Sequence, residues 1–324
     1  MQKTILIPGG AGYIGSHTAF LMHKRGYKVI IIDNLLHGQE FDHDWAHFIK
    51  ADFTDESVLR DIFTKYNIDV VMHFAALIEV GESVKRPKDF YENNVIKTIR
   101  LLNMMVEYGV NQMVFSSSCA VYGNPVKVPI DEQNPYNPIS PYGKNKLAVE
   151  FALQDYAVAY GLRYVSLRYF NAAGATLEAS LGEQHDPETH IIPLMLRAIK
   201  NNKPFKMFGT DYNTQDGTCV RDYIHVKDIA DAHVLAFDYL QKGGKSDVFN
   251  LGSEKGYSVK QMVDVAQQVC QKPMQVDMCA RRAGDVDMLI ADSTKIKNIL
   301  GWSPKHSDLL HILESAWRWE QRSL

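Results

Sequence analysis

The sequence predicts an α/β protein built on a doubly wound parallel sheet, with a smaller mixed α/β region toward the C-terminus. Short apolar runs alternate with helical periodicity over the first half of the chain, which is typical of parallel β-α-β units. A glycine-rich turn separates the first apolar run from the first helix. From about Ala172 the pattern changes to short helices separated by loops that contain Gly and Pro.

The expected elements follow from these periodicities in chain order. Strands are expected near Ile5–Pro8, Val29–Asp33, His47–Ala51, Val70–Phe74, Gln112–Ser116 and Arg163–Tyr169. Helices are expected between them near Tyr13–Arg25, Asp55–Tyr66, Asn94–Tyr108 and Pro141–Tyr160, and later near Pro193–Asn201, Lys227–Gln241, Val259–Cys270 and His306–Glu320. We therefore expect a Rossmann-like domain over residues 1–171, to which 214–251 returns, and a second region over 172–324.

The glycine-rich turn indicates what the first domain binds. Residues 9–15 contain Gly9, Gly12 and Gly15 directly after a buried strand and before a helix. Glycines there let a pyrophosphate approach the backbone at the helix N-terminus. The next apolar run ends in Asp33, whose carboxylate can accept hydrogen bonds from both ribose hydroxyls of NAD. Because no Arg or Lys follows in residues 34–38 to bind a 2′-phosphate, the sequence favours NAD over NADP.

Composition excludes several classes of partner. The chain has 324 residues, 46% hydrophobic and 23% charged, which suits a globular protein with a sizeable core. A net charge of −3 without runs of like charge gives no reason to expect nucleic acid. No apolar run approaches the ~20 residues of a membrane-spanning helix, and the N-terminus lacks a signal-peptide pattern. A cytoplasmic protein that binds no membrane is expected.

Cysteine and histidine spacing gives no reason to expect a metal. His43 and His47 lie beside acidic residues without further ligands nearby in the sequence, and a solvated surface is expected there. His185 and His190 lie in a polar stretch and are expected to belong to a loop. The cysteines form no Cys-x-x-Cys pair and are expected to be reduced: Cys119, Cys219, Cys270 and Cys279.

A second motif supplies groups for proton transfer. Ser140 is a favourable N-cap and Pro141 suits the first helical position. Tyr142 and Lys146 then lie four residues apart on one helix face. A tyrosine pKa of about 10 is too high for a base at neutral pH, but a nearby ammonium and the cationic nicotinamide would lower it. A hydroxyl of the serine-rich segment 116–118, at the end of the fifth expected strand, can hydrogen-bond the substrate oxygen that exchanges its proton with Tyr142.

Together these motifs resemble the extended short-chain dehydrogenase/reductase family, and within it the UDP-galactose (UDP-glucose) 4-epimerases along nearly the whole chain. The more specific similarities lie in residues 168–171, 220–226 and 281–285. The resemblance implies that the sugar is oxidised at C4 by NAD⁺ to a 4-keto form, turns its other face and is reduced again. Tyr142 would be the acid/base, Lys146 its electrostatic and ribose partner, and Ser118 the hydroxyl that shares the proton.

The same resemblance implies a set of binding residues by position. NAD would be held by Gly9, Gly12, Tyr13, Ile14, Asp33, Asn34, Asp52, Phe53, Phe74, Ala75, Asn93, Ser116, Tyr142, Lys146 and Tyr169. The nucleotide sugar would be held by Ser118, Asn171, Phe208, Arg221, Arg282 and Asp285. Arginines suit a diphosphate because they donate bidentate hydrogen bonds. A homodimer is also implied, through the helices near residues 94–108 and 141–160.

Because the sequence departs from the family pattern at three positions, it does not determine which UDP-sugar is the substrate. Ile78 occupies a position where some relatives have a Lys that contacts the cofactor. His190 occupies a position where others have an Asn near the diphosphate. Leu289 occupies a position where the size of the residue governs access of N-acetyl sugars. Residues 118–120 contain no carboxylate, which argues against related dehydratases and decarboxylases. A 4-epimerase of a UDP-N-acetylhexosamine, UDP-pentose or UDP-uronate remains the alternative, and a dehydrogenase that exchanges NAD(H) is a further one.

Overall fold

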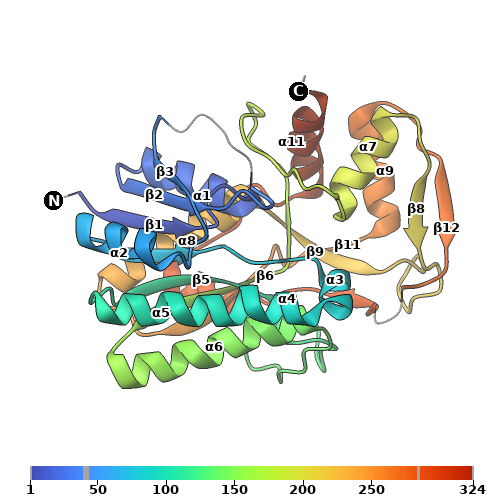
Figure 1. Cartoon of the computed structure of the whole chain (residues 1–324). Helices are drawn as coiled ribbons and strands as arrows, with labels where there is room; N and C mark the ends of the chain where they lie inside the picture. The colour runs from blue at the N-terminus through green and yellow to red at the C-terminus, as the bar shows by residue number, and fades with distance from the viewer. Residues whose placement is uncertain (1, 39–43, 283–284, 323–324) are drawn as a thin grey trace.

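The computed structural model describes residues 2–38, 44–282 and 285–322, and its centre is the predicted doubly wound sheet. Seven parallel strands follow the order β10-β6-β5-β4-β1-β2-β3. Their bounds are β1 (Thr4–Pro8), β2 (Lys28–Asp33), β3 (His47–Lys50), β4 (Val70–His73), β5 (Gln112–Ser118), β6 (Arg163–Tyr169) and β10 (Asp247–Leu251). The predicted fold class is confirmed, and Figure 1 shows the helices that flank the sheet.

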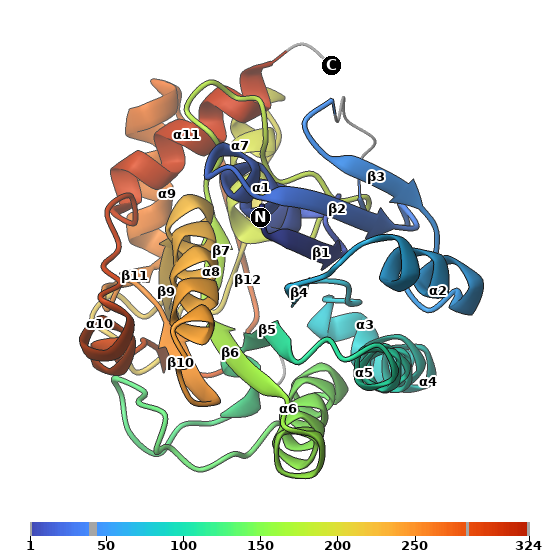
Figure 2. The same ribbon diagram turned by 90° about the vertical axis from the view of Figure 1, so that its left-hand side faces the viewer.

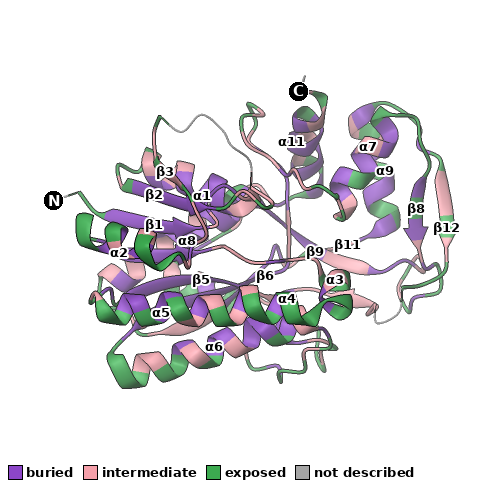
Figure 3. Cartoon of the chain, viewed as in Figure 1, coloured by how far each residue is buried: buried purple, intermediate pink, exposed green. Residues whose placement is uncertain are grey.

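Helices cover both faces of this sheet because successive strand residues point to opposite sides. On one face Ile5 and Ile31 pack with α1 (Tyr13–Lys24) and α8 (Val226–Gln241). On the other face Leu6 packs with side chains of α2 (Glu56–Lys65), α5 (Lys97–Glu107) and α6 (Pro141–Tyr160). Figure 2 shows this layering, and in Figure 3 the central strands are buried while α5 and α6 have exposed outer faces.

The second region lies beyond the carboxyl ends of the strands (Figure 1). Its helices α7 (Ile191–Lys200), α9 (Val259–Cys270) and α11 (Leu309–Gln321) share one hydrophobic cluster. A small sheet contains β7 (Asn171–Ala173), β9 (Val220–His225), β11 (Gly256–Ser258) and β13 (Met288–Leu289). A parallel pair joins β8 (Phe205–Phe208) and β12 (Val276–Cys279). The remaining short helix, α10 (Thr294–Leu300), contacts β10 and α8.

Several elements differ from the prediction. The stretch before α5 contains two unpredicted short helices, α3 (Val80–Lys85) and α4 (Pro87–Tyr91), and a π-helical turn over Glu92–Ile96. The π-helical turn occupies the residues up to Ile96, so the α-helical hydrogen-bonding pattern of α5 begins at Lys97 instead of Asn94. α11 begins at Leu309 because the Asp308 side chain caps it by accepting from the amide of His311. No helix of the described chain is long and apolar enough to cross a membrane.

Candidate active site

A large cavity lies where the carboxyl ends of the sheet strands meet the second region. Its volume is about 1190 Å³, which exceeds the ~300–1,000 Å³ of a typical pocket for one small ligand. Its described lining includes every site residue that the sequence predicts except Asp52. The Asp52 carboxylate instead forms an ion pair with Lys97 and accepts hydrogen bonds from Thr54.

The glycine turn forms one wall of this cavity. Gly9 has a φ of +77°, and a Cβ there would lie 2.3 Å from the amide nitrogen of Ala75, so only glycine fits. Gly12 is the N-cap of α1 and has no side chain to accept from the first amides of the helix. A Cβ on Gly12 would meet only the carbonyl oxygen of Gly9, at 3.4 Å. The turn therefore leaves an open helix N-terminus that suits a pyrophosphate.

Asp33 stands at the end of β2 on the same wall and is 8% exposed. Its Oδ2 accepts from the amide of Ala11 at 3.0 Å, and its Oδ1 accepts from the amide of Leu35 at 2.8 Å. Each oxygen keeps a further lone pair for a ligand hydroxyl. Burial raises the pKa of Asp33, and the two backbone hydrogen bonds oppose that change. An acceptor held in this way suits the ribose of a dinucleotide.

The predicted proton-transfer group lies on α6 and at the end of β5. Ser140 caps α6 by accepting from the amide of Gly143 at 3.1 Å. Lys146 is 4% exposed, and its Nζ donates to the carbonyl oxygen of Ser116 at 2.7 Å. The same Nζ lies 5.7 Å from the centre of the Tyr142 ring. Tyr142, Lys146 and Ser118 all line the cavity.

The electrostatics of this group differ from the prediction. Burial raises the pKa of Tyr142 to about 12, and the hydrogen bond with Ser118 only partly offsets it. Burial also lowers the pKa of Lys146 to about 7, although Glu150 opposes that change. The depression of the Tyr142 pKa by Lys146 and NAD⁺ stays a prediction for the cofactor-bound protein. Without ligands, the loss of hydration on burial outweighs it.

Basic and aromatic side chains line the far end of the cavity. The Arg282 guanidinium lies 4.2 Å from the centre of the Phe208 ring, and within the described chain it has no carboxylate partner. Its neighbour Arg281 instead pairs with Asp211 and Asp287, at 2.6 Å and 3.4 Å. Arg221 projects from β9 into the same cavity. Two cations without a carboxylate partner in the described chain therefore face this end, where a diphosphate would find bidentate donors.

Two further predicted residues are fixed at this end. Asn171 donates through Nδ2 to the carbonyl oxygen of Asp222 at 2.7 Å. The Asp285 carboxylate accepts from the Tyr212 hydroxyl at 3.3 Å. Both line the cavity, and each keeps polar atoms that can bind a ligand.

Sequence reasoning missed some of the lining. Glu79, which precedes α3, and Tyr223 on β9 border the cavity, and only their places within or next to the family motifs could have indicated them. His185 and His190 do lie in a segment without regular structure between β7 and α7, but there they meet two glutamates. His47 begins β3, and His43 lies outside the described residues.

Comparison with known proteins assigns the family. The family model for the NAD dependent epimerase/dehydratase family matches residues 5–252. The chain belongs to this family. Among curated proteins, it is 49% identical to a UDP-glucose 4-epimerase of Rhizobium meliloti (strain 1021), over 99% of this chain and 98% of the relative. It is also 49% identical to one of Halalkalibacterium halodurans, over 98% and 95% of the two chains.

Solved structures of this family agree with the fold. The crystal structure of UDP-glucose 4-epimerase from Brucella ovis in complex with NAD has a TM-score of 0.95 and 45% identity, with 98% of both chains covered. The enzyme from Bifidobacterium longum in complex with NAD⁺ and UDP has a TM-score of 0.92 and 35% identity, also with 98% of both chains covered. The agreement includes the second region as well as the sheet.

Proposed function

We propose that this chain interconverts UDP-galactose and UDP-glucose by inverting the configuration at sugar C4, with NAD as a retained cofactor. The observation that carries the proposal is one cavity shared by the glycine turn and Asp33, by Tyr142, Lys146 and Ser118, and by the two arginines. The activity named for relatives that match nearly the whole chain supports the same reaction.

The residues of the chain divide the chemistry between them. The glycine turn and Asp33 would hold NAD, whose chemistry is reversible hydride transfer at C4. Tyr142, as its phenolate, would take the proton of the 4-hydroxyl and later give it back. Ser118 lowers the pKa of Tyr142 and so favours its phenolate. Lys146 is fixed by the carbonyl of Ser116 and would add positive charge beside the bound ribose.

Further proposals follow for the organisation of the protein. Residues 1–171 with 214–251 would bind NAD, and residues 172–324 would bind the nucleotide sugar. This division is supported by β10, which lies in the central sheet, and by β8, which lies in the second region.

A homodimer would form through α5 and α6. Its support is the exposure of Phe151 and Val158 on α6, at 48% and 91%. A reducing cytoplasmic location is supported by the free thiols of the cysteines.

The test of the proposed function is to incubate the purified protein with UDP-galactose without added cofactor and to follow UDP-glucose by chromatography. Turnover under these conditions would support epimerisation with retained NAD. No turnover, even with added NAD, would exclude UDP-galactose and direct the assay to UDP-N-acetylhexosamines, UDP-pentoses and UDP-uronates. Activity that appears only with added NAD and leaves NADH would instead identify a dehydrogenase.

Asp33→Asn is expected to weaken NAD binding about 10- to 100-fold, since hydrogen bonds to a charged acceptor contribute ~1.5–3 kcal/mol each. The measurement is the NAD content of the purified protein and the dissociation constant after NAD removal. Asp69→Asn is the matched control, because Asp69 also accepts a backbone amide, that of Thr4, but does not line the cavity. Equal NAD content in both variants would contradict the role of Asp33.

Arg282→Ala is expected to raise KM for the UDP-sugar at least tenfold, because a charge-assisted hydrogen bond to the diphosphate contributes ~1.5–3 kcal/mol. Arg281→Ala is the control. Arg281 is already paired with Asp211 and Asp287, so its loss should change KM much less. Steady-state kinetics on both variants decide the point, and a larger effect from Arg281→Ala would reverse the assignment.

A further inference from the structure

A compact group of two carboxylates and two imidazoles lies at the edge of the cavity, in the segment between β7 and α7. It consists of Glu183, His185, Glu188 and His190, and one potential ligand atom of each lies within 4.8 Å of the others. The side chains of Glu183, His185 and Glu188 are 7%, 10% and 3% exposed. His190, at 42%, is the most exposed of the four.

Four nitrogen-to-oxygen distances within the group lie near the ligand spacing of a metal site. His190 Nδ1 lies 2.8 Å from Glu183 Oε1 and 3.2 Å from Glu188 Oε1. His185 Nδ1 lies 3.4 Å and 3.9 Å from the same two oxygens. Tetrahedral zinc binds nitrogen and oxygen at ~2.0–2.2 Å, which separates its ligand atoms by about 3.3 Å. The four distances therefore bracket the value that a zinc ion would require.

Two atoms of the group are buried without a hydrogen-bond partner. They are His185 Nδ1 and Glu188 Oε2. The nearest opposite charge to Glu188 Oε2 is the Arg197 guanidinium, at 3.6 Å, which is too far for a hydrogen bond. Because buried polar atoms are nearly always paired, two such atoms in one cluster point to a cation that would coordinate both.

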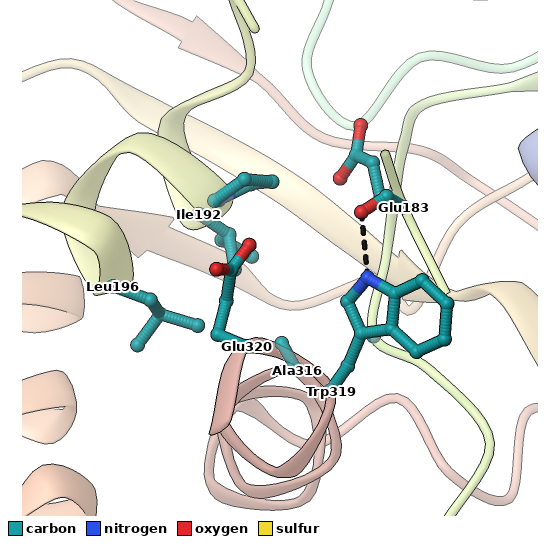
Figure 4. Close-up of a pocket in the computed structure, with 8 residues that line it drawn as sticks. Glu183, Ile192, Leu196, Ala316, Trp319 and Glu320 are labelled. Carbon is teal, nitrogen blue, oxygen red and sulfur yellow. Dashed lines mark hydrogen bonds between the residues drawn. The ribbon is translucent and has the colours of Figure 1, made fainter. Parts of the chain in front are cut away.

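The backbone around the group is already fixed. The Glu183 carbonyl oxygen accepts from the Trp319 indole of α11 at 2.7 Å. Figure 4 shows this bond and shows the Glu183 carboxylate directed away from the indole. The small cavity drawn there, about 10 Å³, would hold one water at most, so it is not the cation site. Glu188 Oε1 accepts the amides of Thr189 and His190, both at 2.9 Å.

We propose that Glu183, His185, Glu188 and His190 bind one divalent transition-metal ion of the zinc class. Mixed imidazole and carboxylate donors favour zinc over calcium or magnesium, which prefer all-oxygen sites. Four protein ligands leave no open position, so the ion would be structural. It would tie residues 183–190 together next to the start of α7, which His190 caps. The proposal goes beyond the proposed function, because the metal would not take part in the reaction at C4.

The alternative is an ion-pair network without metal. A protonated His190 would then supply one positive charge between the two carboxylates. In that network His185 Nδ1 would face Glu183 Oε1 at 3.4 Å and Glu188 Oε2 would face Arg197 at 3.6 Å. Neither contact is a hydrogen bond in the structure, whereas a divalent ion supplies two charges and could coordinate the two side chains directly.

The test is calorimetric titration of zinc chloride into the EDTA-treated, NAD-containing protein. The expected result is one zinc per chain, with affinity reduced at least 100-fold in His185→Asn and in Glu188→Gln. His311→Asn is the matched control, because His311 belongs to a separate histidine cluster with His225 and His306. Thermal melting shows whether each variant is folded. Absence of zinc binding, or binding unchanged in both ligand variants, would overturn the proposal.

A second measurement does not depend on the variants. Crystals of the unchanged protein soaked in zinc should give an anomalous difference peak between His185 and Glu188. A peak elsewhere, or none, would leave the ion-pair network as the correct description. Neither measurement uses epimerase activity, so a failure of the zinc proposal remains distinct from a failure of the proposed function.

Discussion

Replacing Tyr142 with phenylalanine is expected to lower kcat for epimerisation by about 10²- to 10⁴-fold, the usual contribution of a positioned acid/base. The change removes only the hydroxyl, and the ring still fills its partly buried site at the start of α6. Retained fold and retained NAD are therefore expected. Conversion of UDP-galactose, measured alongside NAD content and thermal melting, tests all three points.

The control for this variant is Tyr156→Phe on the same helix. The Tyr156 hydroxyl donates to the side chain of Asn103 at an exposed position, away from the cavity. Its removal should leave kcat close to that of the unchanged protein. If Tyr142→Phe kept more than a tenth of the activity, another group would have to move the proton. Lys146, whose pKa burial lowers to about 7, would be the first to examine.

The phenolate form of Tyr142 needs help from the bound ligands. In the protein alone, burial raises the pKa of Tyr142 to about 12, so the phenol is protonated at neutral pH. The cationic nicotinamide of NAD⁺ would favour the phenolate. Proton removal by Tyr142 would therefore depend on the oxidised cofactor. Such a dependence suits a reaction in which the proton and the hydride leave the sugar together.

What the sequence predicts well is local. The glycine turn, Asp33 at the end of a strand, and Tyr142 and Lys146 one helical turn apart are patterns within a few residues, and the backbone carries them directly into the cavity. Asp52 stays a predicted cofactor contact, and in the structure its carboxylate pairs with Lys97 on α5. A contact between residues 45 positions apart is not visible in local periodicity.

Other features depend on tertiary packing and could not be predicted in this way. The pairing of β8 with β12 joins segments about seventy residues apart, and neither strand has a distinctive pattern. The rise of the Tyr142 pKa in the protein without ligands could not be predicted from the sequence, because desolvation depends on everything that packs around the phenol. The two histidines of the loop were recognised, but the glutamates that complete their cluster become partners only through the fold of the segment.

Beneath the candidate site lies a buried ion pair that links α6 to β5 and β6. Arg168 and Glu150 are 0% and 1% exposed. Glu150 Oε1 accepts from Arg168 Nε at 2.9 Å and from the Ser117 hydroxyl at 2.5 Å. Arg168 also donates to the Tyr122 hydroxyl at 2.8 Å. The pair therefore connects the helix that carries Tyr142 to the strand that ends in Ser118.

Arg168→Met is expected to destabilise the protein by ~3–5 kcal/mol, because it leaves the Glu150 carboxylate buried without its partner. Arg168→Met combined with Glu150→Met should be less destabilised than the single variant, since the double change removes both charges from the interior. Urea unfolding followed by circular dichroism measures the shift in midpoint. Arg60→Met, which breaks the exposed pair with Glu107, should move the midpoint little. If the double variant unfolded earlier than Arg168→Met alone, the hydrogen bonds that Glu150 makes beyond Arg168, including the one from Ser117, would be the main source of stability.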